Sequence, residues 1–219
     1  MNRPVEILTS PIINHDITKK EKNAILHIGW IGDYGENKSY TSPFSHKVSL
    51  NEIFFPALKE LTFRVKLTLL GVRNPKDKEE ITRCFSGFDH IEFEIPMDLD
   101  WQNEKEVYCR VRDFDIGVAP LVEHEFNRAK SAFKAKQYLS CGVPVLATPL
   151  GENCRFVDDG SNGFLCLSGK DFKDRIAAFD KMSTPEYEEV SKNSLDSIPK
   201  FSIDTYCEQF VESVEKHIK

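Results

Sequence analysis

The residues best suited to chemistry form a cluster of positive charges at the start of a predicted helix. Residues 127–138 (NRAKSAFKAKQY) hold four cations within nine positions, namely Arg128, Lys130, Lys134 and Lys136. A helix N-terminus disfavours positive charge and favours an anion, so a bound anion would resolve this conflict. Lys130 and Lys134 are four residues apart and share a helix face, and Ser131 is available as the N-cap or as a hydroxyl donor to the same anion. The spacing predicts a diphosphate site, and the alternative is a solvated turn whose cations pair with Glu123 and Glu125.

A glycine-bearing loop gives weaker evidence for a ligand. Gly29, Gly32 and Gly35 are spaced G-x-x-G-x-x-G, which differs from the dinucleotide fingerprint G-x-G-x-x-G. Only Glu52 comes near the position about 20 residues later where that fingerprint has an acidic residue, and it falls on a predicted helix. The pattern G-x-x-x-x-G-K-[ST] is absent. A nicotinamide dehydrogenase and a P-loop nucleotide triphosphatase are therefore disfavoured.

Alternating strand and helix patterns would position these residues at one edge of a parallel sheet. Short apolar runs predict six strands, at 24–29, 63–70, 90–95, 114–120, 143–147 and 163–167. Helical spacing predicts helices at 49–61, with Ser49 as N-cap, at 76–85, 104–112 and 131–141, and through most of the chain from residue 170. The predicted class is α/β, a doubly wound, mainly parallel Rossmann-like sheet with helices on both faces and a helical C-terminal tail. Ligands bind at the carboxyl ends of such strands, which selects the loops 30–38, 121–130 and 148–153.

Composition and charge limit the kinds of protein that this chain can be. The chain has 219 residues, 40% of them hydrophobic and 29% charged, as in folded globular proteins, and its net charge of −6 argues against a nucleic-acid partner. No apolar run approaches the roughly 18 residues of a membrane span, and the first residues lack the apolar segment of a secretory signal. The six cysteines and six histidines lack metal or redox spacing. We expect a cytoplasmic protein with mostly buried, reduced thiols and no metal site.

The run from Asp115 to Phe164 resembles the nucleotide-sugar-binding half of the group 1 glycosyltransferases of GT-B fold. That family has a strand of type D-I-G-x-x-P-L, then G-x-P-V-[VI]-A-[ST], then G-x-x-E-x-V-x-D-G-x-N-G-x-L. These elements fall at 115–121, 142–148 and 151–165, with Cys154 in place of the glutamate. The resemblance covers about 140 residues from Ala24 onward. Trp30 and Gly32 resemble the W-x-G variant of the family, in which R-x-K-x-x-x-K-x-x-Q-Y replaces the usual pair of glutamates.

The resemblance implies transfer of a sugar from a nucleotide-diphosphate sugar to an acceptor, with retention of configuration and without a metal or other cofactor. It implies donor binding by Gly32, Lys130, Ser131, Lys134, Gln137, Gly151 and Glu152. The family's two glutamates fall on Ala129 and Gln137, and an amide contacts a ribose without the strength of a carboxylate.

The family's arginine after the first strand falls on Trp30, which leaves Lys38 as the nearby cation. Our hypothesis is that Arg128 and Lys130, as catalytic groups, stabilise the leaving diphosphate together with Lys134. Trp30 is expected to pack in the core more readily than to stack on a sugar. Glu152 has the alternative role of complementing a helix dipole, and His27 that of a satisfied core histidine.

The expected organisation is a linker or arm over 1–23 and one donor-binding domain over 24–219. The family resemblance implies a second domain that binds the acceptor, which we expect to be missing here or to be a separate partner, and through which any peripheral membrane association would occur. The helix predicted at 202–218 resembles the one that crosses back to that domain. Two alternatives stay open: a non-catalytic module that binds a nucleotide sugar, and an α/β interaction domain without a ligand.

Overall fold

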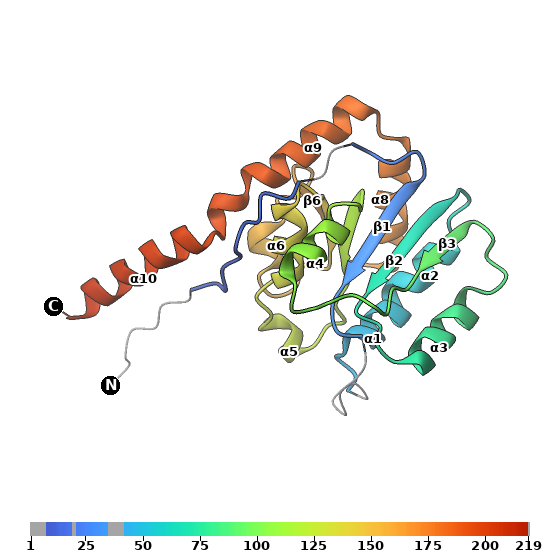
Figure 1. Cartoon of the computed structure of the whole chain (residues 1–219), viewed down its shortest axis with the longest axis horizontal. Coiled ribbons are helices and arrows are strands. Elements are labelled where there is room, and N and C mark those ends of the chain that lie inside the picture. The colour runs from blue at the N-terminus through green and yellow to red at the C-terminus, as the bar shows by residue number, and fades with distance from the viewer. Residues whose placement is uncertain (1–7, 19–20, 35–41, 219) are drawn as a thin grey trace.

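A six-stranded parallel sheet forms the centre of the computed structural model, which describes residues 8–18, 21–34 and 42–218 (Figure 1). The strand order is β3-β2-β1-β4-β5-β6, and every neighbouring pair is parallel. The strands are β1 (Leu26–Ile31), β2 (Val65–Leu70), β3 (Ile91–Glu94), β4 (Ile116–Ala119), β5 (Val145–Ala147) and β6 (Gly163–Leu165). All six predicted strands are present, and the predicted fold class is confirmed. The order reverses between β1 and β4, which is the switch point where such sheets bind ligands.

Helices pack on both faces of this sheet. They are α1 (His46–Ser49), a π-helical turn (Leu50–Phe54), α2 (Phe55–Lys59), α3 (Pro75–Phe85), α4 (Glu104–Val111), α5 (Glu125–Arg128), α6 (Phe133–Ser140), α7 (Asn153–Phe156), α8 (Gly169–Lys181), α9 (Thr184–Asp196) and α10 (Ile203–Ile218). Trp30, Phe54 and Phe172 belong to the buried cluster on one face. Phe114 and Tyr138 belong to the cluster on the other.

Two strand glycines allow aromatic side chains on the second face to lie directly against the sheet backbone. A Cβ at Gly29 would lie 1.9 Å from the Phe114 ring, and one at Gly117 would lie 2.3 Å from the Tyr138 ring. The Tyr138 hydroxyl accepts a hydrogen bond from Ile31 N at 2.8 Å and donates to Val118 O at 3.3 Å. Tyr138 thus bridges β1 and β4 where their direct pairing has ended, and it anchors α6 at the switch point.

Two helix starts differ from the predictions. The chain enters α1 at Ser45, whose hydroxyl accepts from Val48 N, whereas Ser49 is buried inside the helix and its hydroxyl accepts from Val122 N. Ser131 is not the N-cap of α6, because Ala132 occupies that position in the left-handed conformation, with φ 53°. The short helix α5 was not predicted, and α7 was foreseen only through the alternative role of Glu152, which is its N-cap.

Residues 8–18, which belong to the predicted linker or arm, pack against the domain. Ile12 is buried, its N–H donates to Phe201 O at 3.0 Å, and it forms a β-bridge with Ser202 at the start of α10. Figure 1 shows the arm and α10 leaving the sheet on the same side. The prediction that most thiols are buried was wrong, since only Cys141 and Cys166 are buried among six free cysteines. No helix in the described ranges is long and apolar enough to cross a membrane.

Candidate functional site

Two adjoining clefts lie at the switch point, on either side of the N-terminal end of α6. The first has an empty volume of about 470 Å³ and the second about 810 Å³. The end of β4 and the residues after it line the first cleft, the residues after β1 line the second, and Phe133 and Lys134 line both. Because the strand order reverses between β1 and β4, this is where a doubly wound sheet is expected to bind a ligand.

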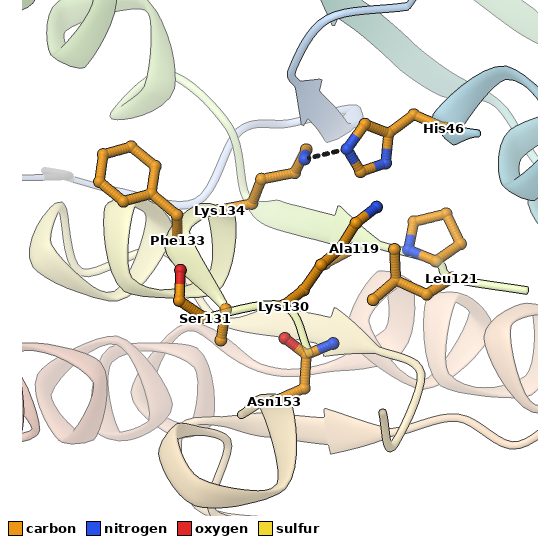
Figure 2. Close-up of a pocket in the computed structure, with 10 residues that line it drawn as sticks. His46, Ala119, Leu121, Lys130, Ser131, Phe133, Lys134 and Asn153 are labelled. Carbon is orange, nitrogen blue, oxygen red and sulfur yellow. Dashed lines mark hydrogen bonds between the residues drawn. The ribbon is translucent and has the colours of Figure 1, made fainter. Parts of the chain in front are cut away.

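Lys134 lies at the boundary of the two clefts and pairs with a histidine. Its Nζ is 2.8 Å from Nε2 of His46, the first residue of α1, as Figure 2 shows. Burial, followed by the charges of Lys134 and Lys130, lowers the pKa of His46 to about 2, so this imidazole is neutral and its Nε2 accepts a hydrogen bond from the Lys134 ammonium. Burial and, to a smaller extent, the charge of Lys130 lower the pKa of Lys134 to about 7, against the opposing charge of Asp33. Lys134 is therefore a cation whose charge an anion would stabilise.

Lys130 reaches into the first cleft from the turn before α6 (Figure 2). Its Nζ lies 5.6 Å from the centre of the Phe126 ring, and burial lowers its pKa to about 8. Among the described residues, no carboxylate is within ion-pair distance of Lys130 or of Lys134. Lys130 and Lys134 are therefore partly buried cations without a described carboxylate partner.

Polar and aromatic side chains surround the second cleft. Gly32, Lys134 and Gln137 line it together with Arg73, which follows β2, and Trp101, which precedes α4. The Arg73 guanidinium lies 4.9 Å from the centre of the Trp101 ring.

Gly32 is constrained by its neighbours, since a Cβ there would lie 2.5 Å from Cε of Lys134 and 2.9 Å from the Trp30 ring. Asp33 also lines this cleft, and its Oδ1 is buried without a hydrogen-bond partner among the described residues. The second cleft therefore has room and polar groups for an extended ligand that also reaches Lys134.

Three predicted site residues line neither cleft. Arg128 is exposed and its Nε donates to Glu123 Oε1 at 2.6 Å, which is the ion pair that the alternative interpretation expected. Glu152 faces Thr9, Lys136 and Arg155 rather than the clefts. Gly151, with φ 57°, lies against the backbone of Lys130, where a Cβ would be 2.5 Å from the carbonyl oxygen. Gly151 and Glu152 therefore contact the backbone of Lys130, and their side of that turn faces away from the clefts.

Lys136, the fourth cation of the predicted cluster, is not available to a ligand. Its side chain is fully buried, and its Nζ donates to Thr9 Oγ1 and to Ser10 O, each at 2.7 Å. Ser131, by contrast, lines the first cleft, and its Oγ accepts from Ser10 Oγ at 3.0 Å. Lys38 lies outside the described residues.

The structure also shows where Trp30 and His27 lie. Trp30 is fully buried and meets Tyr34 and His46 edge to face, so it packs and does not present a face to a sugar. His27 is buried with Nε2 2.8 Å from Thr68 Oγ1. No group of three or more potential metal ligands occurs within the described part of the chain.

Sequence reasoning missed His46, Arg73 and Trp101, which lie outside the selected loops, and it did not single out Asp33 within the selected loop 30–38. Asp33 and Arg73 each follow a predicted strand closely, and proximity to a strand's carboxyl end could have selected them. His46 directly follows Ser45, the N-cap of α1. Correct prediction of that cap would have placed His46 at the same edge of the sheet as the lysines.

Comparisons with known proteins identify the family and the fold. The family model for group 1 glycosyl transferases matches residues 40–181. No curated protein sequence matches the chain. A glycosyltransferase from Rickettsia africae has a TM-score of 0.63 at 13% identity, over 90% of this chain and 49% of that one.

Two further solved structures share the fold. HepE from Anabaena, solved with UDP-glucose, has a TM-score of 0.60 at 16% identity, over 88% of this chain and 49% of that one. The C-terminal domain of LpcC, a group 1 family protein from Francisella tularensis, has a TM-score of 0.56 at 20% identity, over 90% of this chain and 97% of that one. The chain therefore spans about half the length of the Rickettsia and Anabaena proteins and nearly all of the isolated LpcC domain. Because the family model covers more than half of the sequence, the chain belongs to the group 1 glycosyltransferases, and its fold is that of their C-terminal domain.

Proposed function

We propose that this domain binds the donor of a glycosyl transfer, a nucleotide-diphosphate sugar, with its diphosphate at Lys130 and Lys134. The observation that carries the proposal is this pair of half-buried lysines, which have no carboxylate partner among the described residues and lie at the switch point. The Anabaena structures with UDP and UDP-glucose support a uridine nucleotide as the first ligand to test.

The geometry suits the chemistry of the transfer step. Breaking the bond between the sugar C1 and the diphosphate leaves negative charge on the diphosphate, and fixed cations stabilise that charge most as the bond breaks. Lys134 and Lys130 are held for this task by His46, by the Trp30 ring and by the turn before α6. We propose that Lys130 is a catalytic group. We also propose that the transfer retains the configuration of the sugar, uses a hexosyl donor and requires no metal. Arg128 could join only by leaving Glu123.

The second cleft is the proposed place of the nucleoside. Gln137 lies beside Lys134 there, as a ribose contact would require, and its amide can donate or accept one hydrogen bond to a hydroxyl. The acceptor is proposed to bind in a second domain or on a separate partner, in line with the match to only about half of the Rickettsia and Anabaena chains. Six free thiols support a reducing compartment such as the cytoplasm. Peripheral membrane association, if present, would involve the acceptor part.

Calorimetric titration with UDP, UDP-glucose and uridine tests donor binding. Lys130→Met keeps the aliphatic stem over Phe126 and removes the charge, so it should weaken UDP binding about 10- to 100-fold and leave uridine unchanged. Lys192→Met, an exposed site on α9 away from both clefts, is the matched control. Equal loss for UDP and uridine would refute the diphosphate role, and no nucleotide binding at millimolar concentration by the folded protein would refute donor binding.

A non-catalytic donor-binding module is the second candidate. It is favoured by Ala129 and Gln137, because both positions lack the carboxylates that the family resemblance implies. The two candidates differ in turnover: a transferase releases UDP from UDP-glucose when its acceptor domain and acceptor are supplied, whereas a binding module releases none.

A further inference from the structure

A buried polar cluster lies behind the clefts and involves the N-terminal arm. Lys136 Nζ donates to Thr9 Oγ1 and Ser10 O at 2.7 Å, and Thr9 Oγ1 donates to Glu152 Oε2 at 2.5 Å. The Lys136 ammonium is also 3.8 Å from Glu152 Oε2. Thr9 is buried and the Lys136 side chain is fully buried. The arm therefore supplies the polar groups that satisfy a cation inside the domain.

This cluster is connected to the turn that carries Lys130. Glu152 N donates to the carbonyl oxygen of Lys130 at 3.0 Å, and Ser10 Oγ donates to Ser131 Oγ at 3.0 Å. Both ends of the cluster thus contact the Lys130–Ser131 turn, one through the loop after β5 and one directly. Because Ser131 lines the first cleft, a displacement of the arm would change the wall of the proposed diphosphate site.

The arm's path is itself fixed at a second point. Ile12 is buried, pairs with Ser202 in a β-bridge and donates its N–H to Phe201 O. This attachment sets the register in which Thr9 and Ser10 reach α6. A buried lysine that loses one of these partners retains an unmet desolvation cost, so the surrounding backbone would shift to satisfy it.

We propose that the arm is a positioning element for the donor site, and that Thr9 and Ser10 hold the Lys130–Ser131 turn in its ligand-binding position through Lys136 and Glu152. This inference rests on the proposed function, because it assigns to the arm an effect on binding of the diphosphate. It also gives Glu152 a positioning role in place of a direct contact with the sugar. None of Thr9, Ser10, Lys136 and Glu152 lines either cleft, so each acts through the turn.

The test is the UDP affinity of Thr9→Val, which keeps the side-chain shape and removes the hydroxyl. We expect UDP to bind about five- to tenfold more weakly while uridine binds as before, and Thr9→Ser to restore the affinity. Asn14→Ala is the matched control on the same arm, because the side chain of Asn14 bonds to Asp16 alone. Titrations are done well below each variant's unfolding temperature, so that loss of stability does not change the folded fraction.

A double variant separates positioning from a general structural role. Since Thr9 and Lys136 act in one cluster, Thr9→Val/Lys136→Met should bind UDP no more weakly than the weaker of the two single variants. If Thr9→Val does not fold, Ser10→Ala removes the direct bond to Ser131 and serves the same test. Unchanged UDP affinity in the folded variant, or equal loss for UDP and uridine, would overturn the positioning role alone. A wild-type protein that binds no UDP would overturn the proposed function as well.

Discussion

The affinity of the site for a nucleotide sugar should fall as the pH rises from 6 to 9. Burial and the neighbouring Lys130 charge lower the pKa of Lys134 to about 7, and burial lowers the pKa of Lys130 to about 8. A lysine with a lowered pKa is charged below that pKa and loses its charge above it, so the positive form that attracts a diphosphate disappears within this range. His46, whose pKa is about 2, stays neutral throughout and adds no titration of its own.

The size of the effect follows from these two values. Above its pKa, the charged fraction of a lysine falls about tenfold for each pH unit. Between pH 6 and pH 9 the charged fraction of Lys134 therefore falls about 100-fold, and that of Lys130 about tenfold. If the diphosphate binds only to charged Lys134, its Kd rises about 100-fold, equivalent to about 2.7 kcal/mol. A requirement for both charges raises the ceiling to about 1000-fold.

Calorimetric titration with UDP-glucose at pH 6, 7, 8 and 9 measures this dependence, because the esterified diphosphate has no proton to lose in that range. Ionic strength is held constant, since salt screens the same attraction. The Lys134→Met variant should bind weakly and show only the shallower dependence that Lys130 supplies. Kd values that agree within about twofold across the range, or an equally steep dependence in Lys134→Met, would refute the assignment of these lysines to the diphosphate.

Three further outcomes follow from the same cluster. Without ligand, Lys134→Met should raise the free energy of unfolding, most strongly below pH 7 and progressively less toward pH 10.5. The reason is that a lysine with a lowered pKa destabilises the folded state only at a pH where the unfolded chain still binds the proton. Urea unfolding at pH 6 and pH 9.5 measures this difference. Gly32→Ala should weaken UDP binding in calorimetry while the protein stays folded, because the new Cβ would lie 2.5 Å from Lys134 Cε. Trp30→Ala should lower the free energy of unfolding by about 3–5 kcal/mol in the same urea assay, since the indole is fully buried; a loss below about 1 kcal/mol would contradict its core role.

The strands were predictable because each is a short apolar run that ends at glycine, proline or a polar turn. The helix α5 was not predictable, and α7 was foreseen only through the alternative role of Glu152, since each helix has four residues and is too short to show a helical period. The start of α1 was misplaced by four residues because Ser45 and Ser49 are equally good caps by type. What separates them is tertiary: the Ser49 hydroxyl is buried and accepts from the backbone of Val122, a contact that spans two distant segments.

Most of the site that the sequence predicted is contiguous in it, and the exception, Gly32, was selected by the family resemblance rather than by spacing. Lys130, Ser131 and Lys134 belong to one turn and one helix, so their spacing alone indicates a shared direction. His46 comes from the helix after β1, and Arg73 follows β2, so only the strand order brings them together. Strand order is a property of the folded sheet, and local pattern does not encode it.

The four cations around the start of α6 illustrate why a charge cluster has to be resolved into individual partners. A helix start disfavours positive charge, but the fold gives two of the four cations carboxylates of its own: Arg128, at the end of α5, pairs with Glu123, and Lys136 is enclosed by the arm and Glu152. The remaining two, Lys130 and Lys134, face the clefts, and neither has a described carboxylate within ion-pair distance. Because burying an unpaired cation costs free energy, a bound anion is the partner that would stabilise them, and the same unmet cost makes the site's affinity depend on pH.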